Sequence, residues 1–181
     1  MKLKRLSKDD ITKLESKWLG LLGDDTDGVI KADYNQLFNI IKSTGCWGDI
    51  KESYNKPLYS CVIDSNDKEW GIVEIVLSQN NGSSIWVKIL DIHLSPEIET
   101  EDDTEESTKS RLKVFKAALT GTFDLTKDVR NANTVKVFGR TDVLVAFLRG
   151  MHESFSVLAT LGTISGITVS IEGRWLVFRT K

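Results

Sequence analysis

The sequence predicts one α/β domain in which a mixed, mostly antiparallel sheet carries helices on both faces. The first observation behind this prediction is the order of apolar patterns along the chain: two helical, three extended, one helical, one extended, one helical and two extended. The second is the length of 181 residues. It is most simply a single domain, 1–181, which can bury a core without metals or disulfides.

Two helices are predicted near the N-terminus. Residues 7–22 begin with Ser7 as a helix cap and Asp10 at the third helical position, which is close to a capping box. The expected buried face of this helix consists of Ile11, Leu14, Trp18 and Leu21 or Leu22. A second helix is expected over 32–43, with a buried set of Leu37, Phe38, Ile40 and Ile41.

Three strands are expected to follow in a meander. YSCVID (59–64) and EWGIVEIVLS (69–78) are typical of a hairpin closed by SNDK, and NNG marks a second turn before the longest strand, 84–94. Pro96 is expected to end that strand, because proline has no N–H to donate to a ladder.

The C-terminal half is expected to supply two crossovers and a closing hairpin. Helices are predicted over 107–119 and over 143–160, the second capped by Asp142, with a strand over 134–139 between them. The first of these helices would bury Leu112, Phe115 and Leu119. The hairpin ITVSI–EG–RWLVF would turn at Glu172-Gly173. Its expected pairs are Ile171 with Arg174, Val169 with Leu176 and Ile167 with Phe178, and the last four of these residues would share one face.

Negative charge is concentrated between the longest strand and the next helix. Residues 97–106 contain seven acids and no lysine or arginine, whereas the rest of the chain has 24 basic and 19 acidic residues, a net charge of +5. This asymmetry is too weak to indicate a nucleic-acid partner. The segment is expected to be a mobile, solvated loop, and the alternative is an acidic patch for a basic protein partner.

Missing patterns exclude several classes of protein. No signal-peptide stretch and no run near the roughly 18 apolar residues of a membrane span occur, so a cytoplasmic protein without membrane contact is expected. Cys46 and Cys61 predict reduced thiols, and His93 and His152 without a cysteine cluster predict no metal site. The motifs of common hydrolases and nucleotide-binding proteins are absent.

The segment Ile92-His93-Leu94-Ser95-Pro96-Glu97 is similar to a strand end of the form L-x-V-x-P-E. With the order of elements, it resembles the GNAT (N-acetyltransferase) superfamily over nearly the whole chain. The resemblance implies that this strand splays from its neighbour and admits the pantetheine arm of acetyl-CoA or another acyl-CoA. Main-chain groups of Ile92, His93 and Leu94 would then hold the arm. The resemblance also implies that the next helix start meets the CoA phosphates, through Ser107, Thr108, Lys109 and Arg111.

Two features depart from the family pattern. The family's phosphate loop, R/Q-x-x-G-x-G/A, is replaced by EIETEDDTEESTKS, which has no glycine and puts acids beside a site for a polyanion. Lys109, Arg111 and Lys113 could compensate, or they could form a solvated helix face. The family's proton-donating tyrosine, in the pattern Y-x-x-x-G-F, corresponds to Leu158 in VLATLGTI, with Thr163 at the phenylalanine position.

Candidate catalytic groups lie on the predicted strands. Glu74 and His93 could remove the amine proton, as strand carboxylates do in some members of the superfamily. Alternation along the strands predicts instead that Glu74 and Asp91 point to solvent and that His93 is a structural histidine paired with Asp91. Trp86 and Trp175 are expected to pack in the core and the hairpin, or to line a groove.

Two functional hypotheses follow. The first is an acyl-CoA-dependent N-acyltransferase that moves an acetyl group to an amine by direct attack on the thioester, which needs no catalytic cysteine. The second is a non-catalytic GNAT-like scaffold that acts as a protein-interaction module. An open cleft beside Leu94 and sensitivity of activity to loss of Glu74 or His93 would favour the first. A dimer could form through an exposed edge of the final hairpin.

Overall fold

The structure is a computed structural model that describes residues 1–23, 28–48, 50, 53–79, 84–100, 104–160 and 166–180, with the backbone alone for 157–160. Its seven described strands form one sheet in the order β1-β2-β3-β4-β5-β7-β6, and all neighbours are antiparallel except β4 and β5, which are parallel. The predicted mixed, mostly antiparallel sheet is confirmed. The elements are β1 (Lys2–Arg5), α1 (Lys8–Leu21), α2 (Gly28–Thr44), β2 (Pro57–Ile63), β3 (Glu69–Gln79), β4 (Ile85–Leu94), α3 (Pro96–Glu99), α4 (Glu105–Asp128), β5 (Ala132–Phe138), α5 (Asp142–Thr160), β6 (Ile167–Glu172) and β7 (Trp175–Thr180).

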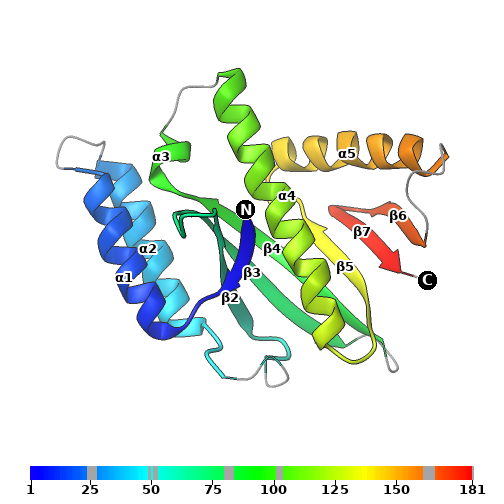
Figure 1. Cartoon of the computed structure of the whole chain (residues 1–181), viewed down its shortest axis with the longest axis horizontal. Helices are drawn as coiled ribbons and strands as arrows, with labels where there is room; N and C mark the ends of the chain where they lie inside the picture. Colours follow the sequence, from blue (N-terminus) through cyan, green and yellow to red (C-terminus); the bar gives the residue numbers. More distant parts are fainter. Residues whose placement is uncertain are drawn as a thin grey trace.

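Helices cover the two faces of the sheet unequally (Figure 1). α1 and α2 lie side by side over one face, where Trp18, Phe38 and Ile72 belong to one buried cluster. α4 crosses the opposite face, where Val114 packs in a larger cluster that also includes Leu148 of α5. Among the described residues, the first cluster takes no side chain from β5, β6 or β7. These three strands therefore carry a helix layer on one face only in the described part of the chain.

One buried tryptophan fixes the layer of α1 and α2. The predicted capping box is confirmed: Asp10 N donates to Ser7 Oγ at 3.1 Å, and Ser7 N donates to Asp10 Oδ2 at 3.0 Å. Trp18, on the buried face of α1, meets Tyr34 and Phe38 of α2 edge to face, with ring centroids 5.8 Å and 5.9 Å apart. This edge-to-face geometry is the one that aromatic rings favour.

α2 presents a different face to the sheet from the predicted one. Phe38 and Ile41 are buried as predicted, but Ile40 is 46% exposed, and the prediction for that residue is wrong. Tyr34, one turn before Phe38, is buried instead. Side chains at spacings of three and four share a helix face, and Ile40 lies outside the stripe of 34, 38 and 41.

α4 is a longer helix than the predicted 107–119. Thr104 caps its start, since Thr104 Oγ1 accepts from Ser107 N at 3.1 Å. Phe115 and Leu119 are buried as predicted, whereas Leu112 is 44% exposed and was wrongly assigned to the core. A Cβ at Gly121 would overlap the side chain of Leu3, so glycine lets α4 cross β1 closely.

Three local details differ from the prediction. β1 was missed, because only one residue of KLKR is apolar and no alternation is visible. The cap of α5 is Thr141, whose Oγ1 accepts from Leu144 N at 3.2 Å, rather than Asp142. The final hairpin turns at Gly173-Arg174, so Val169 pairs with Phe178 and Ile171 with Leu176. This register is two positions from the predicted one and therefore keeps the predicted apolar face.

The acidic segment 97–106 is helical at both described ends. Residues 97–99 belong to α3, which starts at Pro96, and Glu105 and Glu106 form the first turn of α4. Residues 101–103 lie outside the described part of the chain, and the expectation of a mobile loop is untested there. No helix among the described residues combines the length and the apolarity needed to cross a bilayer.

Two neighbouring isoleucines of α2 provide a matched test of this packing. Ile41→Ala should lower the free energy of unfolding by about 2–5 kcal/mol, because Ile41 is fully buried. Ile40→Ala removes the same atoms from a half-exposed position and should cost less than about 1 kcal/mol. Urea unfolding of both variants checks the difference, and equal losses would contradict the orientation of α2.

Candidate functional site

β4 and β5 lie side by side for only part of their length. Their parallel pairing runs from Ile85 to Ile89 on β4 and stops where Ile89 meets Val137. Beyond this point β4 continues to Leu94 along β3, while β5 ends at Phe138. The two strands therefore part in the middle of the sheet, and β4 loses its β5 neighbour over residues 90–94.

Arg174, in the turn between β6 and β7, holds the end of β5 on the side away from β4. Its Nε donates to Gly139 O at 2.7 Å, and its Nη2 donates to Arg140 O at 2.9 Å. Its backbone carbonyl accepts from Gly139 N at 2.8 Å. A bulge at Leu90 changes the β3–β4 register at the same level. Anchoring on one side and a bulge on the other keep the strands apart.

Charged groups from three strands gather beside this opening. Glu74 of β3 lies directly opposite Tyr59 on β2 and Asp91 on β4. Directly paired residues share a face, and Tyr59 belongs to the buried cluster under α1 and α2. The side chains of Glu74 and Asp91 are therefore on the α1–α2 side of the sheet. Arg140, just after β5, spans the opening and places Nη1 3.1 Å from Asp91 Oδ2.

Burial changes the titration of this group. Desolvation raises the pKa of Glu74, the neighbouring Asp91 raises it further, and Arg140 partly offsets both effects. Desolvation also lowers the pKa of His93, against the opposing effect of Asp91, 3.9 Å from the imidazole Nε2. The solvent-facing alternative for Glu74 does not describe the structure, because its carboxylate is half-buried.

The end of β4 offers main-chain groups to the opening, but side chains already use some of them. Ile92 N donates to Asp91 Oδ1 at 2.9 Å, and Leu94 O accepts from Tyr34 Oη at 2.8 Å. Ser95 Oγ, next along the chain, is fully buried and has no hydrogen-bond partner among the described residues.

The start of α4 suits a diphosphate poorly. Thr104 Oγ1 already accepts the hydrogen bond of Ser107 N, which is one of the amides that a helix start would offer to an anion. Lys109 is paired with Glu105 at 2.6 Å, and Arg111 Nη2 donates to Ile98 O at 3.4 Å. Thr108 N is bonded to Thr104 O within the helix. The residues that the resemblance assigns to CoA phosphates are thus committed to the helix start itself.

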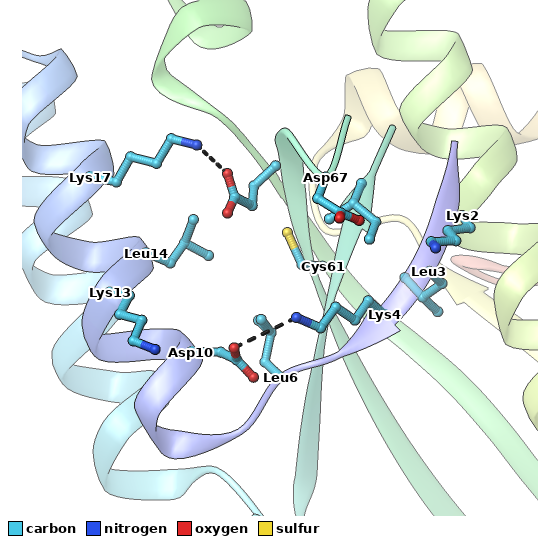
Figure 2. A pocket seen from close by; sticks show the side chains of 12 residues that line it. Lys2, Leu3, Lys4, Leu6, Asp10, Lys13, Leu14, Lys17, Cys61 and Asp67 are labelled. Carbon is cyan, nitrogen blue, oxygen red and sulfur yellow. Dashed lines mark hydrogen bonds and ion pairs between the residues drawn. The ribbon is translucent and has the colours of Figure 1, made fainter. Parts of the chain in front are cut away.

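A cavity lies elsewhere, between α1 and the β1–β2 edge of the sheet (Figure 2). It measures about 650 Å³. Lys4 pairs with Asp10 at 3.7 Å, and Lys17 pairs with Glu69. Cys61 lies on its floor, where burial raises the pKa of the thiol to about 12, so no thiolate nucleophile is available. A smaller hollow on α5 is lined by Phe147, Gly150, Met151, Ser154 and Phe155. Neither cavity is the cleft expected beside Leu94.

Comparison with known proteins finds a likeness of fold alone. No family model and no curated protein matches the sequence. Solved structures that resemble it include a spermidine N-acetyltransferase chimera from Vibrio cholerae, with 13% identity, 99% of this chain and 92% of that chain covered, and a TM-score of 0.44. An acetyltransferase of the GNAT family from Staphylococcus aureus aligns with 9% identity over 98% of this chain and 97% of that chain, with a TM-score of 0.44. A structure from Corynebacterium glutamicum, described as histone acetyltransferase HPA2 and related acetyltransferase, aligns with 9% identity. The alignment covers 98% of this chain and 93% of that chain, with a TM-score of 0.45.

The structure brings together some of the predicted site residues and separates others. Glu74 and His93 lie on one face beside Asp91, and Ile92 and Leu94 lie on the same strand. Ser107, Thr108, Lys109 and Arg111 lie on another element, α4. The side chain of Leu158 and all of Thr163 lie outside the description, so the comparison with the family's tyrosine stays a prediction. Among the described residues, no cluster of three His, Cys, Asp or Glu side chains could hold a metal ion.

Sequence reasoning missed Tyr59 and Arg140. A signal for Tyr59 was present, since a turn at SNDK fixes the β2–β3 register and places Tyr59 opposite Glu74. No sequence signal pointed to Arg140, because its partner Asp91 is far away in the chain.

His93 should make stability depend on pH. Its pKa in the folded protein lies below the usual 6.5, so the unfolded chain binds more protons in the window just below pH 6.5. The stability of the wild type relative to His93→Gln should therefore rise with pH up to about 6.5 and then level off. Urea unfolding between pH 5 and 8 checks this, with His152→Gln on α5 as the control. A relative stability that falls with pH would contradict the assignment.

Proposed function

We propose that this protein is an N-acyltransferase that acetylates an amine, with Glu74 as the general base. The observation that supports this most directly is a half-buried carboxylate at the opening between β4 and β5. No ion pair of the Glu74 carboxylate is present among the described residues, whereas Asp91 beside it is paired with Arg140. Glu74 is thus the member of the pair that can take up a proton.

The raised pKa of Glu74 suits this role. A general base works best when its pKa lies nearer the working pH than that of an exposed carboxylate. Burial supplies most of the increase in the pKa of Glu74, and the positive charge of Arg140 offsets part of it. Glu74 accepts a proton from the incoming ammonium group, directly or through water, and leaves a neutral amine that can attack a carbonyl carbon.

His93 acts as a positioning residue. Burial keeps its pKa low, so the imidazole is neutral near pH 7 and adds no positive charge that would repel an ammonium group. Its Nε2 lies on the side of Asp91. Arg140 fixes the Asp91 carboxylate beside Glu74, with His93 Nε2 3.9 Å from the same carboxylate, so the negative charge left at the opening is that of Glu74.

An acyl-CoA is the proposed donor, and when bound it supplies the thioester carbonyl. The β4 edge from Ile92 to Leu94 is the part of this chain that fits the pantetheine arm, because it has no β5 neighbour. The start of α4 does not fit the diphosphate, since Glu105 and Glu106 occupy its first turn and Ser107 N is capped. The phosphates would therefore be held weakly there.

Release of CoA from acetyl-CoA in the presence of primary amines tests the proposal. Glu74→Gln should reduce kcat by about 10²- to 10⁴-fold, the usual contribution of a general base, without lowering Tm. In the wild type, kcat/KM should rise with pH through a pKa above 4.5, because Glu74 must be ionised. Glu153→Gln on α5 is the control. If no amine releases CoA and neither CoA nor acetyl-CoA raises Tm, the non-catalytic scaffold is the remaining hypothesis.

The acidic turn of α4 gives a separate prediction about cofactor affinity. Replacing Glu105 and Glu106 together by glutamine should tighten CoA binding by about 0.3–1 kcal/mol for each residue, if the CoA phosphates approach this helix start. Calorimetric titration at low and high salt measures this, and the gain should shrink at high salt. Unchanged affinity would place the phosphates away from α4.

A further inference from the structure

The face of the sheet that carries Glu74 continues past α1 and α2 onto β4, β5 and β7, where no described helix covers it. Side chains on this stretch alternate with the buried residues Val87, Val135 and Leu176 of the opposite face. They form what we term the aromatic–lysine face: Trp86, Lys88, Lys136, Phe138 and Trp175.

Two ammonium groups lie against indole rings on this face. Lys136 Nζ is 3.7 Å from the ring centroid of Trp86. Lys88 Nζ is 5.3 Å from the centroid of Trp86 and 5.7 Å from that of Trp175. Phe138 packs against Trp175, with ring centroids 4.8 Å apart and ring planes tilted by 43°. The rings hold the lysine arms close to the sheet, at the distances of cation–π contacts.

The two lysines differ in their counter-ions. Lys136, only 6% exposed, is paired with Glu172 at 2.9 Å. Lys88 has no carboxylate partner among the described residues. Burial and the neighbouring Lys136 both lower the pKa of Lys88. Ser78 is paired with Trp86 across β3 and β4, and its Oγ is buried without a hydrogen-bond partner in the described part of the chain. Lys88 thus presents a positive charge on this face that no described carboxylate neutralises.

Lys88 lies on the strand next to the proposed base and on the same face. Lys88 is directly opposite Val76, and Glu74 lies two residues before Val76 on the same strand and face, beyond the bulge at Leu90. Phe138 and Trp175 lie alongside on β5 and β7. A carboxylate, two aromatic rings and an ammonium group therefore share one face on neighbouring strands.

We infer that the acceptor is an amine that also carries a carboxylate or phosphate group. Its ammonium group lies at Glu74 and Asp91, its carbon chain lies along Phe138 and Trp175, and its anionic group binds Lys88. This inference rests on the proposed function and adds the class of acceptor to it. The anionic group replaces the missing counter-ion of Lys88, which is the complementarity that a charged surface selects.

The same layout disfavours a polyamine acceptor. A second ammonium group in the place proposed for the anionic group would meet Lys88 and Lys136, and like charges oppose binding. The face is also remote from the start of α4, since Lys88 lies in the first half of β4 and α4 follows the other end of that strand. The lysines are therefore not a substitute site for the phosphates of the donor.

Four amines that share one five-carbon chain test this inference: pentylamine, cadaverine, ε-aminohexanoate and ω-aminopentyl phosphate. Their kcat/KM values are measured by CoA release with the wild type, Lys88→Met, Lys88→Arg and the exposed control Lys116→Met on α4. Lys88→Met keeps the arm and removes the charge, Lys88→Arg keeps the charge, and the Tm of each variant shows that it is folded.

The inference requires the carboxylate or the phosphate amine to exceed pentylamine by about tenfold or more, as expected for a hydrogen bond to a charged group, with cadaverine the poorest. Whichever of these two amines has the larger kcat/KM identifies the anionic group, carboxylate or phosphate. Lys88→Met should abolish this preference, so that within this variant the anionic amines fall to the kcat/KM of pentylamine, whereas Lys88→Arg and Lys116→Met should retain it. Similar rates for all four amines, or an equal loss for all four in Lys88→Met, would overturn the inference while leaving the transferase intact.

A second readout separates the two proposals if no amine releases CoA. Tryptophan fluorescence is titrated with pentanoate and with pentyl phosphate, in the absence of CoA, because Trp86 and Trp175 lie beside Lys88. A saturable change in the wild type that is lost in Lys88→Met supports the anion site even though the transferase has failed. The same response in both proteins, or none in either, overturns the anion site.

Discussion

The rest of the site depends on the separation of β4 from β5. In a continuous sheet these parallel strands would stay paired, and their edges would be satisfied by each other. Here Arg174 holds the chain after β5 through the carbonyls of Gly139 and Arg140, while the bulge at Leu90 bends β4 along β3. At the opening β4 has no β5 neighbour, and charged side chains rather than core residues occupy its rim.

The rim shows how burial and charge are balanced. Three ionisable groups, Glu74, Asp91 and His93, lie within one small region beside the guanidinium of Arg140. Arg140 is paired with Asp91, while desolvation and the neighbouring Asp91 raise the pKa of Glu74 and Arg140 offsets this only in part. The raised pKa means that Glu74 binds a proton more readily than an exposed carboxylate does, and this makes Glu74 the candidate base of the cluster.

The sequence predicted most of the fold because its elements have strong local signals. The capping box at Ser7, the three-strand meander and the apolar face of the final hairpin all follow from spacing within a few residues. The strand β1 and the exposure of Ile40 and Leu112 could not be predicted in this way, because tertiary packing decides them. Glu74 and His93 were recognisable as candidates from their strands. Arg140 and the aromatic–lysine face were not, because they form only when β4, β5 and β7 come together.

The two outer strands of the sheet differ in how they would behave in a crowded solution. β1 carries Lys2, Lys4 and Arg5, and such a short cationic edge repels a second copy that would add to it. β6 reads ITVSIE and has one charge, at its end. In the described part of the chain no strand lies beyond β6, so its outer amides and carbonyls are the more permissive template for another strand. The charges of β1 oppose strand addition at one end of the sheet, whereas the sequence of β6 does not oppose it at the other.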